Sequence, residues 1–110
     1  MTHPSENLLS ELRRGTLVLA ILSQLDQQQY GYSLSQTLAE QGIEIEQSTL
    51  YPLLRRLEQQ DLLESEWSTE GSRPRKYYQL SPEGGEVLKT LKEDWFRLSS
   101  TLNRILKQEE

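Results

Sequence analysis

Hydrophobic residues recur every three or four positions through most of the first half of the chain, which is the period of amphipathic helices. The pattern predicts a first helix of about 18 to 20 residues near 8–25. A second, shorter helix runs from Tyr30 and stops near Gly42, a residue suited to a left-handed cap. The polar run 26–29 separates these helices, and the alternating residues 43–46 predict a very short extended piece.

A third helix follows and has the clearest periodicity in the chain. Its apolar positions follow an i, i+3, i+4, i+7 pattern, and Ser48 and Thr49 are candidate caps at its start. We place Pro52 in the first turn, where few N–H groups have intrahelical partners, so the proline does not break the helix. The leucines of the pattern are Leu50, Leu53, Leu54 and Leu57.

The periodicity then changes from helical to alternating, which predicts two strands. Residues Leu62–Ser68 and 75–80 form these strands, and the segment between them, which contains Gly71, is turn material. Together they make a β-hairpin. Ser81, with the proline and glutamate after it, gives three helix-start signals in succession, so a last helix runs from there to about Lys107.

This order of elements predicts a mainly α fold with a β-hairpin wing: a winged helix-turn-helix plus a long C-terminal dimerisation helix. We expect residues 1–7 to form a flexible N-terminal tail, residues 8–80 a winged helix-turn-helix DNA-binding domain, and residues 81–110 the C-terminal dimerisation helix. A chain of 110 residues is long enough for one domain with a small core, and not for two.

The composition excludes several classes of function. The chain has 12 Lys and Arg, 17 Asp and Glu, one His and no Cys, for a formal net charge of −5. Without cysteine there is no disulfide framework, thiolate nucleophile or Cys-ligated zinc. His3 lies in the predicted tail and no carboxylate has a metal-spaced partner, so we expect no enzyme, no cofactor and no metal. The apolar runs are far shorter than the roughly 18 to 20 residues of a membrane helix, which predicts a cytoplasmic protein.

The negative net charge speaks against nucleic acid, but the distribution of charge changes that conclusion. Residues 1–46 hold two basic and six acidic side chains, a balance of −4, whereas the rest of the chain is close to neutral. In the middle of the chain the signs separate. Arg55 and Arg56 lie together in the third helix, and the stretch 72–78 has three cations and no anion. Ordinary solvated surface is the alternative explanation of both clusters.

The face of the third helix opposite its leucines carries groups that suit a DNA groove. An arginine can fork onto guanine, and hydroxyl groups can bond to phosphates or base edges. The alternative is an exposed face whose arginines pair with Glu58, Gln59 or Asp61 nearby. The predicted DNA contacts of this helix are Ser48, Thr49, Tyr51, Pro52, Arg55 and Arg56.

Three cations sit at or beside the turn of the hairpin: Arg73, Arg75 and Lys76. A tip with this charge would project toward a phosphate backbone, so we predict all three as wing contacts with DNA. The alternative is a cationic strand edge that discourages aggregation. Tyr77 and Tyr78 alternate faces, so one packs in the core and the other faces solvent or a sugar-phosphate; the sequence leaves open which.

The closing helix has a coiled-coil type seam with spacings of 3, 4, 3, 4 and 3. A winged domain is too small to cover a helix of roughly 25 residues, so a second copy of the chain is the economical cover, with the first helix as a further element of the interface. The alternative is a helix folded back on its own domain. Trp95 and Phe96 form an aromatic pair that could line a pocket for a planar apolar ligand. The predicted seam is Leu88, Leu91, Trp95, Leu98, Leu102 and Ile105.

Several motifs together resemble the PadR family of transcriptional regulators, over about residues 8–106. They are Leu12–Leu17 (LRRGTL), Tyr30–Tyr32 (YGY), Ser48–Glu58 (STLYPLLRRLE), Arg73–Tyr78 (RPRKYY) and Ser81–Gly84 (SPEG). The resemblance implies a homodimeric winged-helix repressor of the shorter family branch, which has a single C-terminal helix and often responds to ligands or stress. It also implies recognition-helix contacts at Tyr51 and Arg55 and wing contacts at Arg73, Arg75 and Lys76.

These observations predict a PadR-like regulator that binds double-stranded DNA at a palindromic operator as a homodimer, with relief by a small apolar or aromatic ligand as an option. A hypothesis from another class is a winged-helix dimerisation module that binds a protein partner and has lost its affinity for DNA. Saturable, salt-dependent binding to the DNA upstream of its own gene separates the two hypotheses.

Overall fold

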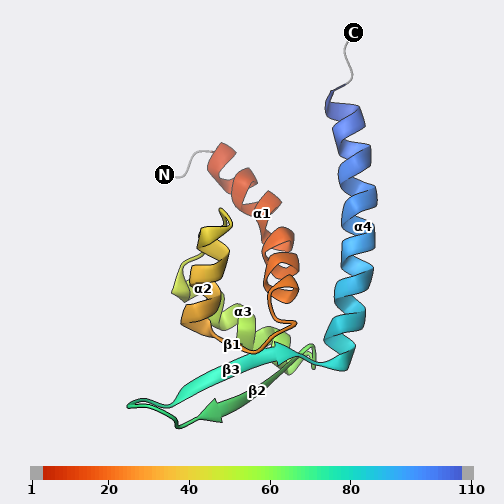
Figure 1. Cartoon of the computed structure of the whole chain (residues 1–110). Coiled ribbons are helices and arrows are strands. Elements are labelled where there is room, and N and C mark those ends of the chain that lie inside the picture. The colour runs from red at the N-terminus through yellow and green to blue at the C-terminus, as the bar shows by residue number, and fades with distance from the viewer. Residues whose placement is uncertain (1–3, 108–110) are drawn as a thin grey trace.

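The fold was analysed in a computed structural model that describes residues 4–107. The helices lie to one side of a small antiparallel sheet at the end of the molecule, and the long last helix projects away from the rest (Figure 1). The predicted mainly α fold with a hairpin wing is confirmed. In chain order the elements are α1 (Pro4–Ser23), β1 (Gln29–Tyr30), α2 (Gly31–Glu40), α3 (Gln47–Gln59), β2 (Leu63–Ser68), β3 (Arg75–Leu80) and α4 (Pro82–Leu106).

The sheet has three strands, not two, in the order β1-β3-β2. β2 and β3 form the predicted hairpin, in which Leu63 lies opposite Leu80. β1 is a two-residue strand on the other edge of β3, with Gln29 opposite Tyr78. Residues 43–46, for which a very short extended piece is predicted, belong to no strand, although Glu46 has an extended backbone with φ −74° and ψ 148°. A two-residue strand has no period of its own, so its partner alone defines it.

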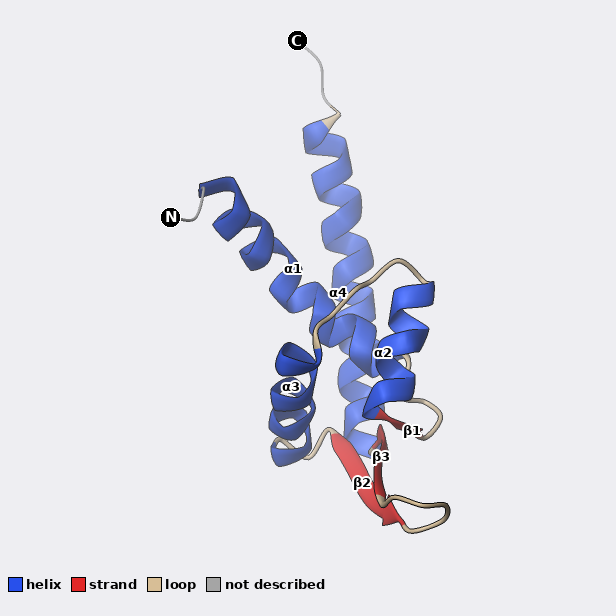
Figure 2. Ribbon diagram, turned by 90° about the vertical axis from the view of Figure 1, so that its left-hand side faces the viewer, coloured by secondary structure: helices blue, strands red, loops and turns tan. Residues whose placement is uncertain are grey.

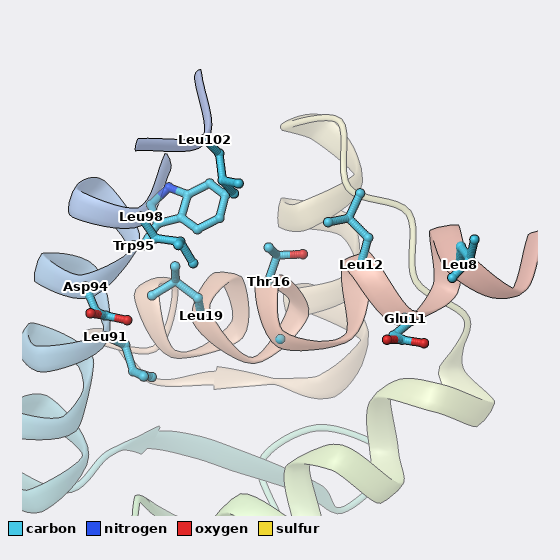
Figure 3. A pocket seen from close by; sticks show the side chains of 11 residues that line it. Leu8, Glu11, Leu12, Thr16, Leu19, Leu91, Asp94, Trp95, Leu98 and Leu102 are labelled. Atoms are coloured by element: carbon cyan, nitrogen blue, oxygen red, sulfur yellow. The ribbon is translucent and has the colours of Figure 1, made fainter. Parts of the chain in front are cut away.

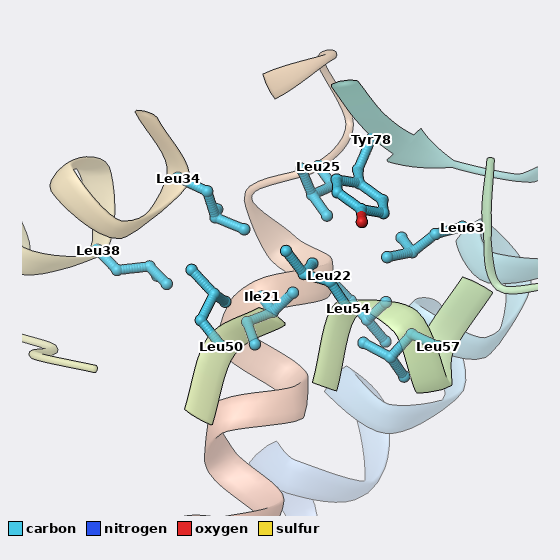
Figure 4. Packing of buried hydrophobic residues seen from close by; sticks show 10 residues of the cluster. All are labelled: Ile21, Leu22, Leu25, Leu34, Leu38, Leu50, Leu54, Leu57, Leu63 and Tyr78. Atoms are coloured by element: carbon cyan, nitrogen blue, oxygen red, sulfur yellow. The ribbon is translucent and has the colours of Figure 1, made fainter. Parts of the chain in front are cut away.

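The core lies where α1, α2, α3 and the hairpin meet (Figure 4). The structure also settles the tyrosine pair: Tyr78 is 5% exposed and joins the core, whereas Tyr77 is half-buried on the other face. The ring of Tyr77 packs edge-on against Tyr30 of β1, with 5.4 Å between centroids. The buried cluster consists of Ile21, Leu22, Leu25, Leu34, Leu38, Leu50, Leu54, Leu57, Leu63 and Tyr78.

The first helix begins at Pro4, so the predicted flexible tail over residues 1–7 is wrong for residues 4–7. Residues 1–3, including His3, lie outside the described part of the chain. Proline at the first helical position has its φ already fixed and needs no N–H partner, and Glu6 is the acid in the first turn. The apolar periodicity begins only at Leu8, so it does not predict this earlier start of the helix.

The start of α3 also differs from the expectation. Glu46 occupies the N-cap position, and within the described chain its side chain makes no capping hydrogen bond. Ser48 and Thr49 therefore lie inside the helix, and Pro52 lies in the second turn, not the first. Its missing N–H leaves the carbonyl of Ser48 without the usual helical partner. Because Ser48 is exposed, water can satisfy that carbonyl, and the helix continues.

Two helices end with the same backbone motif. After α2, Gly42 has φ +94°, and the N–H of Ile43 donates to the carbonyl of Leu38 at 2.8 Å. After α3, Asp61 takes the equivalent place with φ +64°, and the N–H of Leu62 donates to Leu57 at 3.0 Å. Both are Schellman ends, in which a left-handed residue closes the helix. The predicted left-handed Gly42 is confirmed, whereas the motif at Asp61 carries no glycine that would predict it.

Ser81 joins the hairpin to α4. Its hydroxyl accepts the N–H of Gly84 at 2.9 Å, as a helix cap should, and donates to the carbonyl of Asp61 at 2.6 Å. Its own N–H donates to Leu62 at 3.1 Å. A β-carbon at Gly84 would overlap the carbonyl of Leu62, so α4 begins in direct contact with the end of α3. The predicted start of this helix is confirmed.

Candidate nucleic-acid interface

The third helix and the hairpin lie at the end of the molecule opposite to the start of α1 and the end of α4 (Figures 1 and 2). The inner face of α3 is fixed in the core through Leu50, Leu54 and Leu57, none more than 1% exposed. Its other side faces solvent. The exposed predicted residues on it are Ser48, Thr49, Pro52, Arg55 and Arg56.

Tyr51 differs from the other predicted contacts. It is half-buried, and its ring lies against the backbone of Gly31, at the first position of α2. A β-carbon at Gly31 would overlap this ring, so glycine is required there for close approach of the two helices. The packing explains why a glycine stands between Tyr30 and Tyr32. Tyr51 thus positions α3 against α2, and only its exposed part is available to a ligand.

The alternative in which the α3 arginines pair with neighbouring acids is not observed. Among residues 4–107 the ion pairs are Lys76 with Glu58 and Arg97 with Asp94, and neither involves Arg55 or Arg56. The carboxylate of Glu58 turns toward the hairpin instead. Both guanidinium groups of α3 therefore remain available on its solvent face.

The cations of the hairpin are not equivalent. Arg73 lies in the exposed turn after Gly71, whose φ of +87° permits the tight chain reversal. Arg75 begins β3, and its guanidinium lies 4.5 Å above the ring of Tyr30. Lys76 is half-buried and pairs with Glu58. Only Arg73 is free of a partner among the hairpin cations that the structure describes.

Glu58 connects α3 to both strands of the hairpin. It accepts a hydrogen bond from the hydroxyl of Ser65 on β2 and one from the Lys76 ammonium on β3, at 3.0 Å. The Ser65 hydroxyl, and then Lys76, hold the pKa of this carboxyl below its ordinary 4.5. The hydrogen bond to Glu58 in turn raises the pKa of Lys76 above 10.5. The sequence suggests Glu58 only as a partner for the α3 arginines, because no local pattern links it to Ser65 or Lys76 on the two strands.

The acidic groups of the hairpin lie on its other face. Glu64 and Glu66 alternate with Ser65 along β2, so they point away from the side that meets α3. Glu66 accepts a hydrogen bond from Gln28 at 2.6 Å, in the loop before β1. The two faces of the hairpin therefore differ: Lys76 lies on the α3 side, whereas the carboxylates lie on the opposite side together with Arg75.

A second surface feature is an apolar groove of about 620 Å³ between α1 and α4 (Figure 3). Leu12 and Thr16 of α1 lie on one side of it, and Trp95, Leu98 and Leu102 of α4 lie on the other. The first helix forms a whole wall of the groove, with Leu8, Glu11, Leu12, Gly15, Thr16 and Leu19.

The predicted seam of α4 divides into two parts. Leu88 and Leu91 are partly buried and pack on the core of their own chain. The remainder, from Trp95 onward, is exposed. Phe96 is 63% exposed and does not line the groove with Trp95, so the predicted aromatic pair is wrong as a shared pocket lining. Adjacent residues on a helix point about 100° apart, which separates the two rings. The exposed seam residues are Trp95, Leu98, Leu102 and Ile105.

In the described part of the chain, no helix is long and apolar enough to cross a membrane. Nor do residues 4–107 bring together three or more His, Asp or Glu side chains in an arrangement that could hold a metal ion.

Known proteins similar to this chain agree on its class. Residues 18–90 match the model of the transcriptional regulator PadR-like family. A crystal structure of a PadR family transcriptional regulator from Eggerthella lenta shares 48% sequence identity, covers 96% of this chain and 94% of its own, and superposes with a TM-score of 0.87. A PadR-like regulator from Bacillus cereus has 32% identity, coverages of 91% and 100%, and a TM-score of 0.82.

One sequence relative gives the same result. A transcriptional regulator of Mycobacterium tuberculosis is 36% identical over 81 residues, which are 73% of this chain and 76% of the relative. The fold and these similarities define a winged-helix transcriptional regulator, a class without catalytic activity. More specifically, the chain belongs to the PadR-like family, as its motifs indicated.

Proposed function

We propose that this regulator binds double-stranded DNA in a sequence-specific manner through the solvent face of α3 and the hairpin, and that it represses transcription. The observation that carries the proposal is that three arginines on this face form no ion pair within the described residues. Arg55, Arg56 and Arg73 have no ion-pair partner in the described chain, and they lie at the end of the molecule that also carries the hairpin. In this arrangement α3 enters the major groove and the wing follows the phosphate backbone.

Within this face the residues have different roles. Arg55 reads a base, because an arginine on the solvent face of a recognition helix can fork onto guanine. Ser48, Thr49 and Arg56 bond to phosphates and fix the register of the helix. On the wing, the positive charge comes from Arg73 in the turn, Lys76 on the α3 side and Arg75 on the opposite face. Pro52 and the exposed part of Tyr51 add apolar contact.

We further propose that the protein acts as a homodimer on a palindromic operator. The second half of α4 carries apolar side chains that its own chain leaves exposed. The first half of α1 also carries exposed apolar side chains, such as Leu12 at 69% exposure. These surfaces adjoin one another across the groove (Figure 3). A second copy would cover both, and its twofold axis would present two α3 helices to two half-sites.

The groove also has the size and lining of a small-molecule site. Its volume of about 620 Å³ lies within the range of ligand pockets, and Trp95 offers a flat ring to a planar apolar or aromatic molecule. A ligand that binds here could release the operator if it favours a different arrangement of the two copies. This response is part of the proposed function; Phe96, on another side of α4, has no part in it.

The test is a fluorescence anisotropy titration with the DNA upstream of the gene, at several salt concentrations. We expect saturable binding that weakens as salt rises. Arg55→Ala should weaken operator binding by about 1–3 kcal/mol and reduce the preference for operator over unrelated DNA. A protein that shows no salt-dependent binding to this DNA would instead support the partner-binding module, which the net charge of −5 favours.

A further inference from the structure

A tie between α3 and the wing, formed by the hydrogen bonds of Glu58 to Ser65 and Lys76, depends on one side chain. Of the α3 side chains, Glu58 is the one that makes hydrogen bonds to the strands in residues 4–107, and it reaches β2 and β3 at once. Its two partners, Ser65 and Lys76, come from different strands of the hairpin and lie on the same face of it. One carboxylate thus links three elements.

The far end of this tie is anchored as well. The Lys76 ammonium lies 5.3 Å from the ring centroid of Tyr78, which is itself in the core. Glu58 and Lys76 have side chains that are 31% and 29% exposed, so both are partly shielded from competing water. A half-buried carboxylate with a hydroxyl and an ammonium on it has a fixed position, unlike an exposed surface pair.

The location of the tie matters because a two-stranded ribbon twists easily on its own. Beyond Ser65 and Tyr78 the hairpin extends through Trp67 and Lys76 to its turn at Gly71. β1 supports only one edge of β3, where it pairs with Tyr77 and Tyr78. The angle between the distal hairpin and α3 therefore depends on the contact that Glu58 makes.

We propose that Glu58 is a positioning residue of the DNA-binding face, which holds the wing at a set angle to α3, and that Lys76 acts as its counter-ion rather than as a phosphate contact. This inference rests on the proposed DNA binding and refines it. The wing cations that then meet phosphate are Arg73 and Arg75.

The proposal and simple electrostatics predict opposite signs for the same variant. Glu58 is an anion beside a surface that binds a polyanion, so its removal should strengthen DNA binding if only charge matters. It should also free Lys76 to bind a phosphate. If Glu58 positions the wing, Glu58→Gln should weaken binding in spite of the favourable change in charge.

The experiment compares operator affinity and its salt dependence for Glu58→Gln, Lys76→Met and the double variant. We expect each single variant to weaken binding by roughly three- to tenfold, and the double variant to be no weaker than the worse single one. The salt slope should stay unchanged in Lys76→Met, because no phosphate contact is lost. Lys76→Arg, which keeps the donor, should restore most of the affinity.

Glu64→Gln is the matched control, because it removes the same charge from the other face of β2. It should bind DNA as tightly as the wild type or slightly more tightly. Thermal unfolding of every variant shows whether the fold is intact. The proposal is overturned if Glu58→Gln binds as tightly as Glu64→Gln, or if Lys76→Met lowers the salt slope by about one.

A second measurement needs no DNA and so separates this inference from the proposed function. Trp67 lies opposite Lys76 in the hairpin and is 66% exposed, and Trp95→Phe leaves it as the one tryptophan. In that background, Glu58→Gln should increase the fast local component of the fluorescence anisotropy decay of Trp67. If Glu58→Gln leaves the decay unchanged, the positioning role is overturned. If Glu58→Gln increases the fast component but the wild-type protein binds no DNA, only the proposed function is overturned.

Discussion

The α3 end of the molecule and the α1/α4 groove are built from the same kind of leucine pattern, yet they bury it differently. On α3, Leu54 is fully buried inside its own chain. On α4, Leu98 and Leu102 are 46% and 40% exposed, although their spacing is just as regular. Helical periodicity therefore identifies an apolar face, but it does not say whether the same chain covers that face.

The difference has a thermodynamic consequence. A face that closes within one chain contributes to stability at any protein concentration. A face that closes only against a second copy contributes according to mass action, so its effect depends on concentration. Substitutions at matched leucines on the two faces can separate these contributions.

The largest effect is expected at the closed face. Leu54→Ala removes a side chain with 0% exposure and leaves a cavity among α1, α3 and β2, which should cost about 2–5 kcal/mol of the free energy of unfolding. Chemical denaturation at two protein concentrations should give the same loss. A loss that depended on concentration would contradict the separation of the two faces.

A substitution on the open face of α4 should weaken association of the two copies and leave the fold of each copy intact. Leu98→Glu places a charge in the proposed dimer seam and should weaken dimerisation by at least about 2 kcal/mol, because the carboxylate would lose its water there. Sedimentation equilibrium would measure this, while denaturation of the resulting monomer should show the winged domain still folded. Lys92→Glu, at an exposed polar position of the same helix outside the groove, is the control. Equal association of wild type and Leu98→Glu would show that α4 is not the interface.

A smaller effect is expected at the ends of α2 and α3. Asp61→Gly removes a side chain from a residue with φ +64° and keeps the carbonyl that Ser81 uses, so it should stabilise the closed part by about 0.5–1 kcal/mol. Gly42→Ala is the converse, at φ +94° with open space around it, and should destabilise by about 1 kcal/mol through backbone strain alone. Thermal unfolding of both variants tests the pair; effects of the same sign would contradict the argument.

The smallest effect concerns pH. Because the pKa of Glu58 lies below 4.5, its contribution to stability is present above about pH 4.5 and is lost as the pH falls through the lower folded value. The pKa of Lys76 lies above 10.5, so its contribution is present below about pH 10.5 and is lost as the pH rises through the higher value. The stability difference between wild type and Glu58→Gln should thus be constant near neutral pH and shrink on acidification. A difference that grew toward pH 3 would contradict this sign.

The sequence predicts best where the determinants are local. Ser81 and the two residues after it identify the start of α4 because cap, proline and acid act within one turn. The strand β3 follows from its tyrosines and leucine after a turn signal and has the predicted bounds. The Schellman end at Asp61 is harder to predict from the sequence, because an aspartate adopts a positive φ only where the surrounding contacts compensate for the strain.

Features that depend on contacts between distant parts of the chain do not follow from the local sequence. Which tyrosine faces the core depends on which side of the hairpin packs against the helices, and Tyr78 shares that side with Leu63 and Ser65. The tie at Glu58 needs two strands folded back toward α3. The close contact of Tyr51 with Gly31 depends on how α2 and α3 pack, and neither residue alone indicates it. Which cations are free is likewise a property of the fold and not of the local sequence.

The joint at Ser81 also fixes the base of α4 to the rest of the molecule. Its hydroxyl and N–H bond to the end of α3 and to Leu62, and Gly84 sits directly against that backbone, so α4 has no hinge at its base. With 25 residues, α4 is a stiff arm about 38 Å long. In the proposed dimer, the pairing of two such rigid helices would fix the distance between the two α3 helices. The distance between half-sites on DNA would then be set by leucines that never touch it.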